Sequence, residues 1–184
     1  DLKRVWKGGD FLERINSKEK IPLGKDTLVV GGGNTAIDVA RSALRIGSTV
    51  TVAYRRTRAE MPAIHDEIIE AEEEGVAFEF LIQPVKVHLR HPNKLVVTFQ
   101  RMKLGGLDQS NRPKAIPIKG SYLTLEADHL IAAVGEQVDL SWIPQNLIKK
   151  GLVEANPSLK VFAGGDAVDQ PRTIVTAIAS GKKG

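Results

Sequence analysis

Apolar and polar positions follow two different periods in the early part of the chain. Residues 27–30 are apolar or β-branched, glycines follow at once, and small apolar residues then recur at helical spacing as far as Gly47. Val50, Val52 and Tyr54 alternate with threonine and alanine, which predicts a second strand. A parallel pair of strands needs a helical crossover of this kind. We therefore expect a parallel α/β sheet here.

The pattern continues with a helix and then changes to antiparallel strands. A helix is expected over His65–Glu74, capped by Gly75, with a third strand over 76–80. Beyond Pro84, short alternating runs indicate a β-meander, followed by a loop rich in glycine and polar residues and then by a strand or strand pair. The expected ranges are 85–89, 95–99 and 102–104 for the meander, 105–119 for the loop, and 122–134 for the last strands.

Composition and charge narrow the function classes. The chain of 184 residues has 26 basic and 22 acidic residues, a formal charge of +4, and 5% aromatic residues. This balance suits a small anionic ligand, whereas a nucleic-acid surface would need basic stretches interleaved with aromatics. Cysteine is absent, so the sequence excludes disulfides, thiolate catalysis and cysteine-ligated metal clusters within this chain. We expect no nucleic-acid partner.

Targeting signals are not visible in the sequence. There is no apolar run of membrane-spanning length and no apolar signal core after the charged start, so we expect no membrane association and a cytoplasmic location. The chain begins at Asp1 instead of methionine and stops at Gly184 within an expected helix. We therefore expect it to be an excerpt of a longer protein.

A glycine-rich turn joins the first strand to the first helix. Gly31, Gly33 and Ala36 fit the G-x-G-x-x-A form of the dinucleotide-binding fingerprint, in the strand-to-helix context that the motif requires. Gly31 permits the sharp turn, and Gly33 leaves room for a pyrophosphate beside the backbone. The N–H groups at the start of the helix, at Asn34 and Thr35, would hold the phosphates. The motif predicts a Rossmann-like, dinucleotide-binding domain.

Arginines stand where many such domains carry an acidic residue. In an NAD site, a carboxylate after the second strand accepts hydrogen bonds from the ribose hydroxyls. This chain has Arg55 and Arg56 at that place, with Arg58 in the loop beyond. A guanidinium offers a planar fork of donors to a phosphate, whereas a carboxylate would repel the 2'-phosphate of NADP. The pattern predicts NADP(H), with these arginines near the extra phosphate.

These motifs together resemble those of a known family. The chain is similar to the small (beta) subunit of NADPH-dependent glutamate synthase and to related FAD- and NAD(P)-dependent pyridine nucleotide oxidoreductases. The resemblance extends in order over nearly the whole chain. It is carried by 30–38 around the fingerprint, Tyr54-Arg55-Arg56, Met61-Pro62-Ala63, and Val161-Phe162-Ala163-Gly164-Gly165-Asp166.

The resemblance implies two nested domains. Residues 25–150 would form a three-layer, Rossmann-like NADPH-binding domain with a parallel sheet and an antiparallel meander. Residues 1–24 would lead in from an FAD-binding domain, and residues 151–184 would return to it. The family's FAD fingerprint and its iron-sulfur cysteines are not found in this sequence. They would belong to other portions of the same polypeptide.

The same resemblance implies contacts to each cofactor. Gly135, after Ala132-Ala133-Val134, would lie near the nicotinamide half of NADPH. Gly165 and Asp166 would approach the ribityl chain of FAD, and Thr173 and Ile174 would begin a helix that faces the flavin ring. The implied activity is hydride transfer from NADPH to FAD, followed by electron transfer to an acceptor. The implied partner is a large glutamate synthase subunit or another electron acceptor. We expect no catalytic side chain, and an isolated chain without complete turnover.

Other interpretations stay open at this point. A non-enzymatic NADP(H)-sensing Rossmann module would share the fingerprint but would have no use for a flavin-facing strand and helix. A methyltransferase also has a glycine turn, but it usually needs an acidic residue where Arg55 stands. A metal site at His65, Glu67 and Glu70 is disfavoured because no second ligand has convincing spacing, and a solvated helix face explains these residues.

Overall fold

The computed structural model describes residues 4–90, 94–109, 111–135, 140–149, 152–168 and 174–182, with no side-chain placement for Pro157 and Asp166. The chain divides into two compact units, residues 1–135 and 136–184. No helix among these residues is long and apolar enough to cross a membrane.

The first unit is built on a five-stranded parallel sheet in the order β1-β8-β2-β3-β4. Its strands are β1 (Val5–Lys7), β2 (Asp26–Val30), β3 (Thr49–Tyr54), β4 (Ala77–Phe80) and β8 (His129–Ala132). The helices are α1 (Gly8–Asn16), α2 (Asn34–Arg45) and α3 (His65–Glu74), with a short 3-10 turn η1 (Arg58–Glu60). The predicted strand-helix-strand unit is confirmed by the parallel pairing of β2 with β3.

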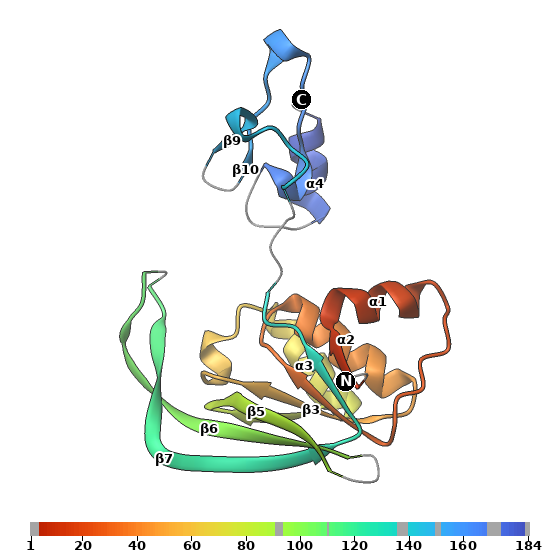
Figure 1. Ribbon diagram of the computed structural model, residues 1–184, viewed down its shortest axis with the longest axis vertical. Coiled ribbons are helices and arrows are strands. Elements are labelled where there is room, and N and C mark those ends of the chain that lie inside the picture. The colour runs from red at the N-terminus through yellow and green to blue at the C-terminus, as the bar shows by residue number, and fades with distance from the viewer. Residues whose placement is uncertain are drawn as a thin grey trace. The chain divides into compact units, whose positions relative to one another are not determined.

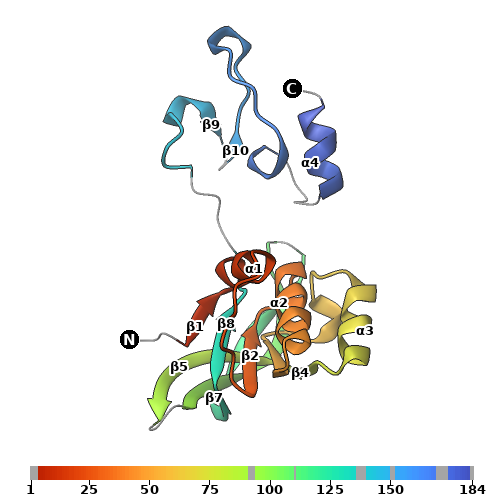
Figure 2. The same ribbon diagram turned by 90° about the vertical axis from the view of Figure 1, so that its right-hand side faces the viewer.

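A second, antiparallel sheet consists of β5 (Ile82–Arg90), β6 (Lys94–Leu107) and β7 (Pro113–Ala127). Figure 2 shows the parallel sheet with helices on one side and this meander on the other. The side chains of β2 explain the three layers. Val29 belongs to the core cluster beneath the helices, whereas Leu28 and Val30 belong to the cluster that also holds meander residues. Both faces of this strand are buried, as a parallel sheet requires.

The helices are amphipathic and end as the sequence predicts. The inward face of α2 is made of fully buried small and branched residues, namely Ala36, Ile37, Val39, Ala40 and Ala43. In α3, Ile68 and Ala71 are buried, and Gly75 follows the helix in the left-handed conformation, with φ of +106°. A glycine makes this C-cap without the strain that a Cβ would add. The expected helix and its cap are both confirmed.

The lead-in segment differs from the expectation of a mere connection. Residues 5–16 form β1 and α1, and β1 extends the parallel sheet by pairing with β8. Phe11 is fully buried in the core beneath the helices, and Trp6 contacts it edge-on. The scattered apolar residues of this segment are spaced too irregularly to reveal a three-residue strand. The sheet therefore begins earlier in the chain than the sequence pattern indicates.

The prediction of a loop over residues 105–119 is wrong. Strand β6 runs on to Leu107, and β7 starts at Pro113, so the two form a long hairpin (Figure 1). The distal part of β7 is largely exposed on both faces. Because no face needs to be continuously apolar, this stretch has the polar, glycine-containing composition of a loop. The expected strand or strand pair over 122–134 is resolved as the end of β7 followed by β8.

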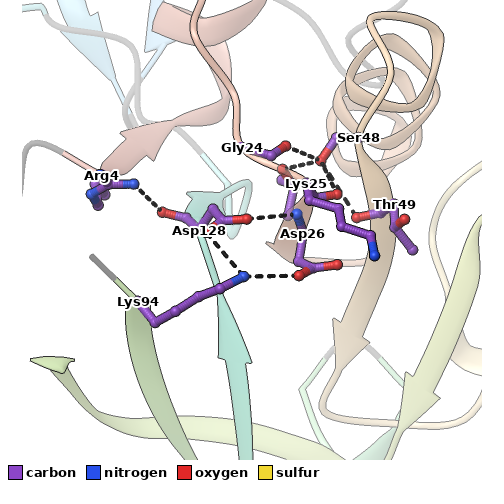
Figure 3. Close-up of polar contacts among 9 residues, drawn as sticks. Arg4, Gly24, Lys25, Asp26, Ser48, Thr49, Lys94 and Asp128 are labelled. Atoms are coloured by element: carbon purple, nitrogen blue, oxygen red, sulfur yellow. Dashed lines mark hydrogen bonds and ion pairs between the residues drawn. The ribbon is translucent and has the colours of Figure 1, made fainter. Parts of the chain in front are cut away.

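The amino ends of the parallel strands are held by a polar cluster (Figure 3). The Lys94 ammonium lies 2.9 Å from Asp26 and 3.0 Å from Asp128, and Asp128 accepts a hydrogen bond from the Asp26 N–H at 2.9 Å. These two carboxylates raise the pKa of Lys94, Asp26 having the larger effect. Lys94 begins β6, so the cluster fastens the meander to β2 and β8 at the edge opposite to the glycine turn.

The elements in the described part of the second unit are all short. They are η2 (Gln145–Leu147), β9 (Ile148–Lys149), β10 (Leu152–Val153), η3 (Pro157–Leu159), η4 (Gly165–Ala167) and α4 (Ile174–Gly181). Strands β9 and β10 form an antiparallel pair. Large apolar side chains of α4 are exposed within the described residues, with Ile174 at 80% and Val175 at 76%.

Candidate dinucleotide-binding site

A cleft of about 510 Å³ opens at the carboxyl ends of β2, β3 and β8. The glycine turn, the residues after β3 and the residues after β8 line it, together with the start of β5 and one residue of the β6–β7 hairpin. In open α/β sheets, ligands bind beyond the carboxyl ends of the strands. The site lies where the connections from two neighbouring strands run in opposite directions along the sheet. Strand β2 lies at such a point, between β8 and β3. The cleft is therefore where this fold class places a nucleotide.

The three glycines of the turn meet different neighbours. A Cβ on Gly31 would lie 2.2 Å from the Ala133 carbonyl oxygen, and the φ of +151° at Gly31 is one that L side chains rarely adopt. A Cβ on Gly32 would lie 2.5 Å from the Tyr54 ring. A Cβ on Gly33 would meet nothing closer than Pro62 at 3.9 Å. Packing within the protein thus requires glycine at Gly31 and Gly32, whereas Gly33 borders the open cleft.

Helix α2 begins at the cleft without a side-chain hydrogen bond to its first turn. Gly33 is its N-cap, and the Ala36 N–H donates to the Gly33 carbonyl at 2.9 Å. Thr35 lines the cleft. The side chain of Asn34 is turned to the neighbouring loop, where its Oδ1 accepts the Ile64 N–H at 2.9 Å. The first backbone N–H groups of α2, at the positive end of the helix dipole, can therefore bind an anion.

The loop that follows β3 is fastened to the glycine turn. The Ala63 N–H donates to the Gly32 carbonyl at 3.2 Å, and the Tyr54 hydroxyl donates to the Glu60 carbonyl at 2.8 Å. The Glu60 carboxylate accepts from both the backbone and the hydroxyl of Thr57, at 3.0 and 2.6 Å. These bonds hold the arginine-containing end of β3 at a fixed position beside the glycine turn.

The structure brings two of the three predicted arginines to the cleft. Arg55 lines it and is exposed. Arg56 lines it too, but is only 4% exposed, and its guanidinium donates to the Pro113 carbonyl at 2.7 Å and to Asp108 at 2.6 Å. Arg55 is thus placed to meet a ligand from solvent. Arg56 has two of its nitrogens bonded within the protein.

Arg58 lies elsewhere in the described part of the chain. Its guanidinium pairs with Glu72 of α3 at 2.7 Å, and it borders a second hollow with His65 and Phe80. The residues that line the cleft at the glycine turn do not include it. Its role in NADPH binding stays a prediction from sequence, since its ion pair with α3 accounts for its place in this structure.

Arg112 is a cleft residue that sequence reasoning missed. It immediately precedes β7, the return strand of the long hairpin, and lines the cleft together with the glycine turn. The stretch around it was expected to be a loop, and no sequence spacing relates residue 112 to residues 31–36. A prediction that β6 and β7 continue past residue 104 would have been needed to find it.

The remaining predicted residues fall into two groups. Gly135 lines the cleft with φ of +104°, and a Cβ there would meet nothing within 4 Å. In the second unit, the Gly165 N–H donates to the Ser180 hydroxyl at 2.5 Å, and Ile174 is exposed at the start of α4. The side chain of Asp166 and all of Thr173 lie outside the described residues. Among the residues that are described, no group of three or more His, Asp or Glu side chains could hold a metal ion.

Comparison with known proteins matches the chain over nearly its full length. A family model described as pyridine nucleotide-disulphide oxidoreductase matches residues 2–181. The beta subunit of an NADP(+)-dependent formate dehydrogenase from Moorella thermoacetica is 41% identical over 96% of this chain, which spans 26% of that relative. The small chain of NADPH glutamate synthase from Escherichia coli is 36% identical over 87% of this chain, which spans 37% of that relative.

The fold is also that of solved structures. Thioredoxin reductase from Lactococcus lactis superposes with a TM-score of 0.65 at 19% identity, covering 86% of this chain and 50% of that one. This likeness confirms the predicted α/β class with its parallel sheet and antiparallel meander. The sequence matches confirm the resemblance to the glutamate synthase small subunit and its relatives. The chain belongs to the pyridine nucleotide-disulphide oxidoreductase family.

Proposed function

We propose that residues 25–150 contain the NADPH-binding domain of a flavin-dependent oxidoreductase, and that residues 1–24 lead into it from the FAD-binding domain, with β1 and α1 packed into its sheet and core. Residues 151–184 would return to the FAD-binding domain. In the complete enzyme, NADPH would reduce FAD, and the electrons would pass to an acceptor, as the glutamate synthase small subunit resemblance implies. The family itself implies NADP(H) and FAD as cofactors. The chain spans 26% and 37% of the lengths of these two curated relatives, so the whole enzyme's acceptor and partners belong to this proposal.

One observation supports NADP(H) binding most strongly. The open side of Gly33 and the first N–H groups of α2 face a cleft that Arg55 also lines. A pyrophosphate at the helix start is stabilised by the helix dipole and by the backbone donors. A ribose held beside β3 would then bring its 2'-phosphate toward Arg55. The charge and the space that the cleft offers fit this dinucleotide.

The chain's own residues would bind and orient the nucleotide. NADPH supplies a hydride, and no acid-base side chain is needed for that step. Gly31 and Gly32 let the turn pack against Ala133 and Tyr54, and the Ala63-to-Gly32 hydrogen bond holds the wall beside it. Gly135, which also lines the cleft, would leave room for the nicotinamide half. Catalysis by this domain would consist of positioning.

The FAD contacts at Gly165, Asp166, Thr173 and Ile174 rest on the family resemblance. The Gly165 N–H is already bonded to Ser180 in this unit. The only dinucleotide fingerprint in these 184 residues is the one at residues 31–36. We therefore expect this chain to bind NADPH and to catalyse no complete turnover by itself.

Calorimetric titration with NADPH and NADH tests the proposal. The chain should bind NADPH more tightly, and Arg55→Ala should lose about 1.5–3 kcal/mol of NADPH binding, the range for a charge-assisted hydrogen bond, with little change for NADH. Arg45→Ala is the matched control, since Arg45 is an exposed arginine paired with Glu74 on α2. Equal affinities of the unchanged chain for the two nucleotides would contradict NADP(H) selectivity.

A further inference from the structure

The pairing of the long β6–β7 hairpin is interrupted next to a buried glutamine. The register of the two strands shifts between Gln100 and Met102, where β7 carries extra residues between Pro117 and Tyr122. Gln100 is only 9% exposed, and its amide donates to the carbonyls of Ile118 and Ser121 at 2.6 and 2.7 Å. One side chain thus satisfies the backbone where the ladder is interrupted. The β6–β7 hairpin bends along its length (Figure 1).

The tip of the hairpin is fastened to the end of β3. Asp108 accepts a hydrogen bond from Arg56 at 2.6 Å, and the Pro113 carbonyl accepts another from the same guanidinium at 2.7 Å. The side chains of Arg56 and Asp108 are 5% and 23% exposed. A charge-assisted pair that is largely shielded from water is stronger than a surface pair. Arg56 therefore connects the wall made by β3 to both strands of the hairpin.

The same aspartate shapes the backbone of Arg112. Its Oδ1 accepts the Arg112 N–H at 3.1 Å, and its own N–H donates to the Arg112 carbonyl at 2.7 Å. The turn is closed further by the Asn111 N–H, which donates to the Asp108 carbonyl at 3.0 Å. With its backbone held in this way, Arg112 lines the cleft together with Arg55.

We propose that the hairpin tip is a wall of the nucleotide site, in which Arg112 binds the 2'-phosphate together with Arg55 and the Arg56–Asp108 pair positions Arg112. This inference rests on the proposed binding of NADP(H). It assigns the selectivity for the phosphorylated nucleotide to a segment more than fifty residues beyond the fingerprint in sequence.

The charges in the cleft agree with this division of roles. The carboxylate of Asp108 offsets the charge of Arg56, because the two are in direct contact. The 2'-phosphate of the nucleotide is a dianion near neutral pH. Two guanidinium groups can surround it with hydrogen-bond donors. Arg55 approaches from the end of β3 and Arg112 from the hairpin. Arg56 then acts through Arg112 and Asp108 and is a positioning residue.

Titration with two small nucleotides isolates the 2'-phosphate contact. Adenosine 2',5'-bisphosphate and 5'-AMP differ by that phosphate, and their binding to the chain can be followed by NMR chemical shifts. Arg112→Gln should weaken the bisphosphate about tenfold or more and leave 5'-AMP within twofold, because a charge-assisted contact is lost from one ligand only. Lys114→Gln, an exposed hairpin lysine, is the control with the same loss of charge, and it should leave both ligands within twofold.

The positioning role has its own test. Asp108→Asn should weaken the bisphosphate more than 5'-AMP in the otherwise unchanged chain, and should have little further effect when Arg112 is already glutamine. If Arg112→Gln behaves like Lys114→Gln while Arg55→Ala still loses the bisphosphate, the hairpin inference is overturned and NADP(H) binding by the fingerprint stands. If the unchanged chain shows no preference for the bisphosphate over 5'-AMP, both proposals are overturned.

Discussion

The glycines of one turn are alike in sequence but have different physical reasons to be glycine. Gly31 is required by its positive φ and by the Ala133 carbonyl, which would lie 2.2 Å from a Cβ. Gly33 has no such neighbour inside the protein. If the cleft holds a pyrophosphate, the absence of a side chain at Gly33 serves the ligand and not the fold.

Two alanine substitutions separate these reasons. Gly31→Ala should lower the melting temperature sharply, because the new Cβ would overlap the Ala133 carbonyl oxygen and the backbone there cannot shift without strain. Gly33→Ala should unfold near the temperature of the unchanged chain but bind NADPH at least tenfold more weakly, because its Cβ occupies the space of the phosphate. Thermal unfolding and calorimetry together measure both effects. Unchanged NADPH binding in Gly33→Ala would contradict the assignment of the pyrophosphate to this turn.

Single residues were predictable from sequence where a local motif fixes them. The roles of Gly31 and Gly33 follow from a strand-to-helix turn, and the glycine at position 32 could not be explained, since the Tyr54 ring that excludes a side chain there comes from another strand. Arg56 shows the same limit. Arg55 is exposed in the cleft, whereas the side chain of Arg56 donates hydrogen bonds to Asp108 and to the Pro113 carbonyl. Only the tertiary structure brings these two partners near Arg56.

At the scale of elements, the β6–β7 hairpin depends on Gln100. Gln100→Met keeps the size of the side chain but removes the donor to the Ile118 and Ser121 carbonyls. Leaving these partly buried acceptors unpaired should lower the free energy of unfolding by about 1–3 kcal/mol. Denaturant unfolding measures this loss, with Gln145→Met as the control at an exposed glutamine of the second unit. Equal effects of the two substitutions would show that the interrupted ladder does not need the amide.

Elements with one buried stripe or two buried faces were predicted well, as α2, α3 and β2 show. The distal hairpin was not, because the pattern of burial that identifies a strand is missing from it. Gly105 and Gly106 also favoured a loop in the sequence, whereas in the structure a Cβ on Gly105 would lie 2.2 Å from the Ile116 side chain. That glycine permits close packing across the hairpin and does not end it.

At the scale of the whole molecule, His129 links the first strand to the sheet. It is 6% exposed, its Nδ1 accepts the Trp6 indole N–H at 3.1 Å, and burial lowers its pKa below the ordinary value of 6.5. Nearby Arg4 lowers this pKa further, whereas Asp128 raises it. A neutral His129 is therefore favoured in the folded chain.

The sign of the pH dependence follows from that shift. As pH falls below about 6.5, the unfolded chain takes up a proton at this histidine that the folded chain resists, so stability falls with pH. Denaturant unfolding between about pH 7.5 and pH 5 should show this loss, and His129→Gln should reduce it. His65→Gln, at the exposed start of α3, is the control for replacing a histidine by glutamine. A His129→Gln profile parallel to that of the unchanged chain would contradict the assignment.

Sequence reasoning predicted the fold class and the family for the whole molecule because the fingerprint, the parallel unit and the meander occur in one order. It predicted domain boundaries near residues 24 and 150. The described structure separates into residues 1–135 and 136–184 and includes β1 and α1 in the first unit. Those short elements are held by long-range contacts to β8 and α2, which leave no periodic signal in residues 5–16. The division into NADPH- and FAD-binding parts stays a prediction.

A crystal structure of this chain soaked with NADP⁺ tests the central claim most directly. The account predicts the pyrophosphate against the first N–H groups of α2 beside Gly33, and the 2'-phosphate within hydrogen-bonding distance of Arg55. A nucleotide bound away from the glycine turn, or a 2'-phosphate that points into solvent with Arg55 turned away from it, would contradict the account.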